Sequence, residues 1–82
     1  MDGAGRTIVV VEDEDAIRDV VAYNLGRGGH RVVTAADGRA GLDAVVAGPA
    51  DLVVLDIMLP ELDGLEVCRR LRALDSTRLV PV

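Results

Sequence analysis

The chain has 82 residues, half of them hydrophobic but only one aromatic, so we expect a single domain over residues 1–82 with a thin aliphatic core. Its formal net charge of −5 disfavours direct contact with a nucleic acid, whose backbone is itself polyanionic. A single cysteine excludes an internal disulfide, and no apolar run is long enough for a signal peptide or a membrane span. These features predict a cytoplasmic protein without membrane contact.

The first half of the chain alternates between a strand pattern and a helix pattern. Residues 8–11 are a continuous β-branched run that stops at Glu12, which is typical of a strand buried on both faces of a parallel sheet. From Asp15 the apolar residues take helical spacing until glycines stop the pattern. The positions at this spacing are Ile17, Val20, Val21, Asn24 and Leu25. Residues 31–35 predict a shorter and more polar strand, as expected at a sheet edge.

The second half repeats this alternation. Residues 42–46 predict a helix that ends before a Gly-Pro pair, and residues 52–55 predict a second fully apolar strand that stops at an aspartate. Residues 57–64 contain proline and an Asp-Gly pair and read as a structured loop. A third helix is predicted over residues 67–74, and residues 79–82 look like the beginning of a fourth strand.

This order of elements predicts the fold class. Strands that alternate with helices build a parallel sheet through right-handed crossovers, with helices on both faces. No helix comes after residues 79–82 to cover them, so we expect the domain to be incomplete at its C-terminus. The open strand edge left there would be a template for a second chain, which predicts a homodimer or another form of self-association.

Acidic residues follow two of the predicted strands. Glu12 and Asp13 come directly after the first strand, and Asp56 comes directly after the strand at residues 52–55. If these strands are neighbours, their carboxyl ends lie roughly 5 Å apart and three carboxylates converge on one pocket. A hard divalent cation such as Mg²⁺ would relieve their mutual repulsion. Each acid alone could instead be a solvated helix cap or a turn residue, but the joint pattern favours a site.

Two segments carry a resemblance to a known family. Residues 8–13 (IVVVED) and 51–64 (DLVVLDIMLPELDG) resemble the receiver domains of bacterial two-component response regulators, above all those joined to winged-helix DNA-binding domains. The resemblance implies a flavodoxin-like α/β fold, a doubly wound parallel sheet of strand order 2-1-3-4-5. This chain would stop at the start of the fourth strand and would contain no effector domain.

The resemblance also implies a function for Asp56. Its carboxylate would act as the nucleophile that takes the phosphoryl group from the phosphohistidine of a sensor histidine kinase and so controls an output such as DNA binding. The protein would be a phosphoacceptor that catalyses its own phosphorylation and dephosphorylation when intact, rather than an enzyme with a separate substrate. Pro60 and Gly64 would shape the loop that follows Asp56.

The same resemblance implies a magnesium site. Asp13 and Asp56 would bind Mg²⁺ directly, Glu12 would act largely through a bound water, and the backbone carbonyl of Met58 would complete the protein's share. Receivers of this type also use a Ser or Thr and a Lys further along the chain, and these 82 residues contain no lysine. We therefore expect the chain as given to bind Mg²⁺ weakly and to accept phosphate poorly or not at all.

Two other functions compete with this interpretation. Phosphohydrolases of the haloacid-dehalogenase type also use an aspartate nucleophile after a strand, but they need a second acid two residues later, where this sequence has Met58. A pseudo-receiver, a non-phosphorylated interaction module of the same fold, would lack acidic positions that are present here at Glu12, Asp13 and Asp56. The pseudo-receiver remains the alternative for this chain.

Overall fold

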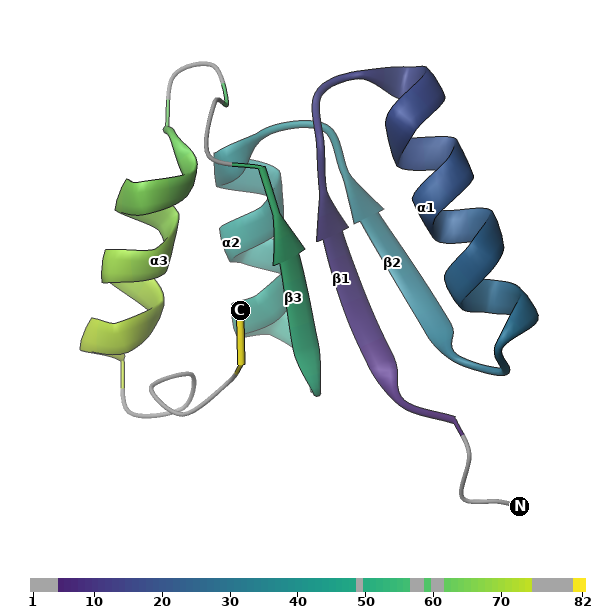
Figure 1. The fold of residues 1–82 in the computed structure, drawn as a ribbon. Coiled ribbons are helices and arrows are strands. Elements are labelled where there is room, and N and C mark those ends of the chain that lie inside the picture. The colour runs from purple at the N-terminus through teal and green to yellow at the C-terminus, as the bar shows by residue number, and fades with distance from the viewer. Residues whose placement is uncertain (1–4, 49, 57–58, 60–61, 75–80) are drawn as a thin grey trace.

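The structure is a computed structural model that describes residues 5–48, 50–56, 59, 62–74 and 81–82. Within these residues a parallel sheet is formed by β1 (Thr7–Val11), β2 (Arg31–Ala35) and β3 (Leu52–Leu55), in the order β2-β1-β3 (Figure 1). The three predicted strands are confirmed, and the more polar β2 lies at an edge of the sheet as expected. The predicted fourth strand at residues 79–82 lies mostly outside the described residues.

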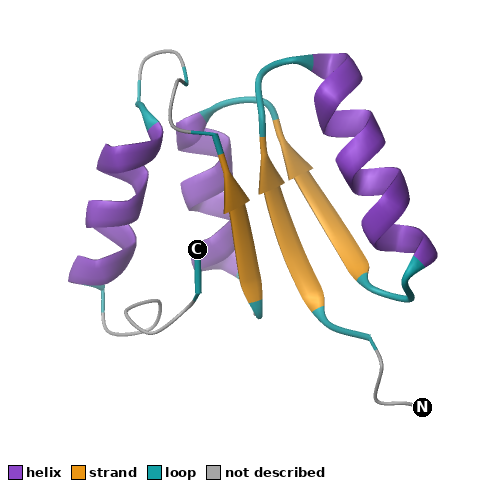
Figure 2. Cartoon of the chain, viewed as in Figure 1, coloured by secondary structure: helices purple, strands orange, loops and turns teal. Residues whose placement is uncertain are grey.

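The helices lie on both faces of this sheet. They are α1 (Asp15–Arg27), α2 (Gly38–Ala47) and α3 (Gly64–Ala73), and Figure 2 shows α2 behind the sheet while α1 flanks it beside β2. Sheet order and helix placement are those of a doubly wound, flavodoxin-like α/β fold, as predicted. No helix in the described part of the chain has the length and apolar character needed to cross a membrane.

The core lies between the sheet and the pair α2 and α3, and it is aliphatic as the composition requires. Strand residues that point to this side contact apolar residues of both helices, and Val67 and Leu71 of α3 have no exposed surface at all. Leu59, from the segment between β3 and α3, is also buried in this core. Among the described residues, the buried members of this cluster are Val9, Val11, Ala35, Leu42, Val45, Val53, Leu59, Val67 and Leu71.

Helix α1 differs from the sequence-based expectation. The apolar spacing predicted an amphipathic helix with one apolar side, but no residue of α1 is buried. Val21 and Leu25 are half-buried, whereas Ile17 and Val20 are exposed. The predicted helix is confirmed, but its apolar positions do not all face the sheet, because adjacent residues such as Val20 and Val21 point in directions about 100° apart. The helix also continues through Gly26 and ends at Arg27.

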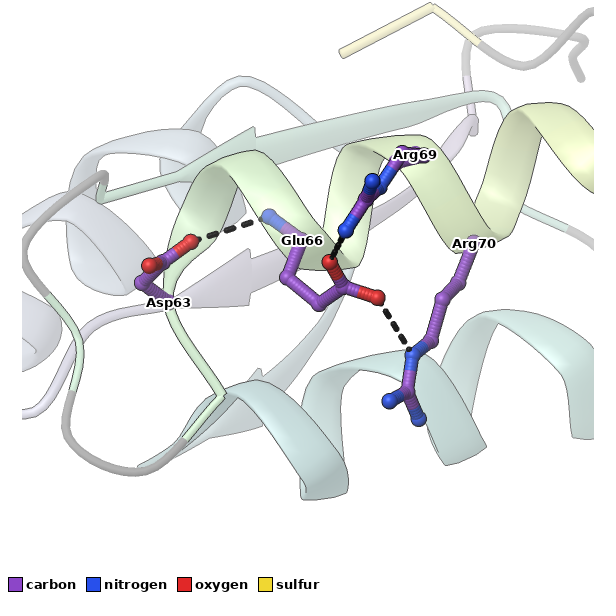
Figure 3. A network of polar contacts seen from close by, with 4 residues as sticks. All are labelled: Asp63, Glu66, Arg69 and Arg70. Carbon is purple, nitrogen blue, oxygen red and sulfur yellow. Dashed lines mark hydrogen bonds and ion pairs between the residues drawn. The ribbon is translucent and has the colours of Figure 1, made fainter.

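The first turn of α3 is held by side chains (Figure 3). Asp63 is the N-cap, and its carboxylate accepts a hydrogen bond of 2.9 Å from the backbone N–H of Glu66. The Glu66 carboxylate accepts hydrogen bonds from Arg69 and Arg70, which lower the pKa of Glu66 and keep it ionised. Gly64, predicted to shape the preceding loop, is the buried first residue of α3, and Pro60 lies outside the described residues.

Two glycines allow α2 to approach its neighbours closely. A Cβ atom at Gly38 would lie 1.9 Å from the backbone carbonyl oxygen of Leu62, and one at Gly41 would lie 2.5 Å from Cγ2 of Val11. The start of α2 therefore lies directly against the backbone of Leu62, just before α3, and the helix packs directly on the end of β1. By its sequence, the Asp-Gly pair at residues 37–38 suits a turn, and it does not reveal this close contact of Gly38.

The Gly38→Ala variant is expected to unfold more easily than the natural chain. Its new methyl group would meet a backbone oxygen that cannot rotate away, and such overpacking costs about 1–3 kcal/mol. Urea unfolding followed by circular dichroism measures this loss. Gly26→Ala is the control, since its Cβ meets nothing within 4 Å and alanine favours the helix by roughly 1 kcal/mol. Equal stability of the two variants would show that Leu62 does not constrain this position.

Candidate functional site

The carboxyl ends of β1 and β3 bring their following residues together. In the register, Val11 pairs with Leu55, and the backbone N–H of Asp56 donates to the carbonyl of Val11 over 3.1 Å. On the other side, the N–H of Glu12 donates to the carbonyl of Ala35 over 3.0 Å. These bonds extend the strand pairing by one residue and fix the backbone of Glu12 and Asp56 at one edge of the sheet.

Three carboxylates converge at this edge. One carboxylate oxygen from each of Glu12, Asp13 and Asp56 lies within 4.8 Å of the other two. Glu12 and Asp56 are half-buried, and Asp13 is exposed, so the cluster is held at the sheet and is accessible from solvent on the Asp13 side. The convergence that the sequence predicted for these acids is therefore present in the structure.

The cluster is electrostatically unfavourable without a counterion. The backbone N–H of Glu14 donates to the Glu12 carboxylate over 3.1 Å and lowers its pKa, but desolvation and the charges of Asp56 and Asp13 outweigh this bond. The pKa of Glu12 is consequently raised above its usual value. A cation placed among the three carboxylates would reverse this effect, because it favours the ionised form of each.

The acidic run at residues 12–15 divides between two roles. Glu14 is the N-cap residue of α1 and Asp15 lies in its first turn, where negative charge favours the helix dipole. Arg18 pairs with Asp15 and also donates to the backbone carbonyl of Glu12 over 2.9 Å, so it fixes the turn between β1 and α1. The solvated-cap interpretation thus holds for the second half of the run, while the first half faces Asp56.

Arg18 was not identified from the sequence, although its spacing of three residues from Asp15 on a helix is a recognisable ion-pair pattern. The remaining predicted ligand, the backbone carbonyl of Met58, lies outside the described residues. The structure therefore describes only those predicted ligands that are carboxylates, namely Glu12, Asp13 and Asp56. Carboxylate oxygens are hard donors, and one or two of them together with water form the usual coordination of Mg²⁺ in proteins, so the residues present fit this ion.

The sequence matches the family described as the response regulator receiver domain over residues 8–82. Transcriptional regulatory protein AfsQ1 of Streptomyces coelicolor is 47% identical over 74 residues, which are 90% of this chain and 33% of that protein. The alkaline phosphatase synthesis transcriptional regulatory protein PhoP of Bacillus subtilis is 49% identical over 67 residues, 82% of this chain and 28% of that protein. The chain thus spans about a third of the length of these curated relatives.

Solved structures share the fold. The N-terminal domain of a response regulator receiver protein from Methanoculleus marisnigri has a TM-score of 0.89 and 45% identity, covering 94% of this chain and 63% of that one. The receiver domain of sensor histidine kinase PA1611 from Pseudomonas aeruginosa, with magnesium coordinated in its active-site cleft, has a TM-score of 0.90 and 35% identity, over 95% and 64% of the two chains. TrrA of Thermotoga maritima, in complex with Mg²⁺-BeF, has a TM-score of 0.80 and 38% identity, over 83% and 59%.

Proposed function

The chain belongs to the response regulator receiver domain family of two-component systems, and on this premise we propose that Asp56 accepts a phosphoryl group from the phosphohistidine of a sensor histidine kinase. The observation that carries the proposal is the convergence of Glu12, Asp13 and Asp56 within 4.8 Å at the carboxyl edge of the sheet. In open parallel sheets this edge is where ligands bind.

Asp13 and Asp56 would hold Mg²⁺ directly, Glu12 would act through a bound water, and the carbonyl of Met58 would supply a further oxygen. When bound, the ion would neutralise the carboxylates and the oxygens of the incoming phosphoryl group, which phosphoryl transfer requires more than covalent help. Two observations support this assignment. Desolvation and the neighbouring carboxylates of Asp56 and Asp13 raise the pKa of Glu12, an effect that a bound cation would offset, and two of the similar solved structures contain magnesium.

The chemical step would form one bond and break one. A carboxylate oxygen of Asp56 attacks phosphorus, the P–N bond to the histidine breaks, and the imidazole leaves. The backbone N–H of Asp56 is engaged with Val11, which fixes the residue at the strand end and leaves its carboxylate half-buried at the edge. Glu12 and Asp13 would repel the phosphoryl oxygens on their own, so their role is to hold the cation.

The output of the whole protein would be regulation of transcription, as the names of its curated relatives suggest. DNA contact would then be made by a separate effector, because this receiver chain is strongly acidic. The receiver would be a phosphoacceptor that catalyses its own phosphorylation and dephosphorylation when intact. The pseudo-receiver alternative is disfavoured by the presence of all three clustered acids.

A chimaeric receiver tests the proposal. In this chimaera, residues 1–82 replace the matching segment of the Methanoculleus marisnigri receiver, which is 45% identical to this chain. The remainder of that receiver completes the domain. Incubation with acetyl phosphate and Mg²⁺ should add one phosphoryl group, measured by intact mass, and EDTA should prevent the gain. The 82-residue chain alone should be labelled more slowly. A folded chimaera that gains no mass while the Methanoculleus receiver does would contradict the proposal.

A further inference from the structure

Arg18 lies on the side of α1 that faces the sheet. Its side chain is only 16% exposed, and its spacing from the half-buried Val21 and Leu25 places all three on one side of the helix. A charged side chain is rarely covered in this way unless its charge is paired. The partners of Arg18 therefore indicate what this side chain does.

The guanidinium of Arg18 joins both ends of the turn between β1 and α1. Its Nη1 donates to the backbone carbonyl of Glu12 over 2.9 Å, and its Nη2 pairs with the exposed carboxylate of Asp15. The turn between these partners contains Asp13, and Figure 1 shows this turn at the edge of the sheet where β1 and β3 end. A guanidinium has no acceptor atom and cannot bind a metal ion itself. Any effect of Arg18 on the carboxylate cluster is therefore indirect.

The carbonyl that Arg18 binds belongs to the peptide unit between Glu12 and Asp13. A peptide unit is planar, so fixing its oxygen limits the directions in which the side chains on both sides leave the backbone. The N–H of Glu12 is bound to Ala35, and the carboxylate of Glu12 accepts the N–H of Glu14, so Glu12 is held at three points. The direction in which the exposed Asp13 leaves the backbone is tied to Arg18 through the same peptide unit.

We propose that Arg18 is a positioning residue that increases the affinity of the carboxylate cluster for Mg²⁺, an inference that rests on the proposed function of this cluster. Mg²⁺ demands a nearly octahedral set of oxygens, and ligands that are already in place lose less conformational freedom when the ion binds. Groups that orient metal ligands without touching the ion typically contribute about ten- to a hundredfold in affinity. Arg18 acts on a single backbone oxygen, so we expect the lower end of this range.

The charge of Arg18, taken alone, predicts the opposite effect. A positive charge near a cation site repels the ion, so a neutral side chain at position 18 would strengthen Mg²⁺ binding if only charge mattered. The positioning role predicts weaker binding. Lysine separates the two further, because it keeps the charge but lacks the planar fork that reaches two partners at once. Arg18→Met and Arg18→Lys should therefore both weaken binding.

Titration of the isotope-labelled 82-residue chain with MgCl₂ at constant ionic strength tests the proposal. The backbone amide NMR signals of residues 12, 13 and 56 report the dissociation constant for Mg²⁺ even when binding is weak, and the dispersion of the spectrum confirms folding. We expect Arg18→Met and Arg18→Lys to raise this constant roughly tenfold. Arg27→Met is the matched control, since it removes the same charge from the exposed last turn of α1, and it should leave the constant nearly unchanged.

Three results would overturn the role of Arg18. They are unchanged or tighter binding in Arg18→Met, an equal loss in Arg27→Met, and full affinity in Arg18→Lys, which would assign the effect to charge. If the natural chain shows no Mg²⁺-dependent shifts, the proposed function itself fails, and this outcome differs from equal binding by the natural chain and its variants.

Urea unfolding separates positioning from a general loss of stability. A purely structural role would lower the free energy of unfolding equally with and without MgCl₂, whereas lost positioning makes the deficit larger when the ion is present. If Arg18→Met does not fold, Arg18→Lys in the chimaeric receiver replaces it. The Mg²⁺ concentration for half-maximal labelling should then rise, while labelling at saturating Mg²⁺ is retained. An unchanged half-maximal concentration would contradict the proposal.

Discussion

The Asp56→Asn variant of the chimaeric receiver is expected to gain no phosphoryl group under conditions that label the natural sequence. Asparagine has nearly the same shape, but its amide is not a nucleophile and carries no charge for a cation. The backbone hydrogen bond from residue 56 to Val11 does not involve the side chain and should persist. The loss would therefore report chemistry rather than misfolding, and intact mass spectrometry measures it directly.

Asp63→Asn is the matched control for this experiment. Asp63 lies in the same family-like segment, but its carboxylate caps α3 by accepting the N–H of Glu66, and asparagine caps helices about as well. Labelling of this variant should equal that of the natural sequence. If Asp56→Asn still gained a phosphoryl group, or if Asp63→Asn lost it, the acceptor would have to be sought at a residue other than Asp56.

The strands and the site acids were predictable because the sequence marks both the apolar runs of the strands and the acids that follow them. The β-branched runs of β1 and β3 stop abruptly at Glu12 and Asp56, and parallel strands deliver their carboxyl ends to one edge. The register adds that Val11 pairs with Leu55, which sets Glu12 beside Asp56. That pairing requires β1 and β3 to be neighbours, a long-range property that no local pattern contains.

Features that depend on packing between elements were not predictable. The period of α1 includes both Val20 and Val21, and only the position of the helix on the sheet determines that Val20 is exposed. Leu59 is buried although it lies in the predicted loop and not in a predicted helix or strand. Asp37 precedes a glycine, a pair typical of turns, but its carboxylate accepts the N–H of Ala40 and caps α2. An Asp-Gly pair suits a turn and a helix start equally well, so the pair alone does not distinguish them.

The acidic run shows how one pattern can contain two functions. Four consecutive acids at residues 12–15 are compatible with a solvated cap alone, and Glu14 and Asp15 do occupy that position at the start of α1. Glu12 and Asp13 are directed to Asp56 instead, because the chain leaves β1 at the edge where β3 also ends. The division falls between Asp13 and Glu14, within the turn that Arg18 holds through the carbonyl of Glu12.

Asp13→Asn in the 82-residue chain is expected to change stability with opposite signs in the absence and presence of Mg²⁺. Without the ion, removing one of three like charges should stabilise the folded chain slightly, since Asp13 contributes to the raised pKa of Glu12. With the ion, the natural chain gains free energy of unfolding by binding it, about 1.4 kcal/mol at ten times the dissociation constant and about 2.7 kcal/mol at one hundred times. The variant should lose most of this gain.

Urea unfolding at constant ionic strength, with and without MgCl₂, separates the effect of charge repulsion from the effect of ion binding. Asp15→Asn is the control, because Asp15 pairs with Arg18 and lies outside the carboxylate cluster, so this variant should keep the full response to Mg²⁺. The stability curves of Asp13→Asn and the natural chain should cross as Mg²⁺ is added. Parallel curves for all three proteins would mean that the carboxylates converge without binding the ion, and the magnesium assignment would have to be abandoned.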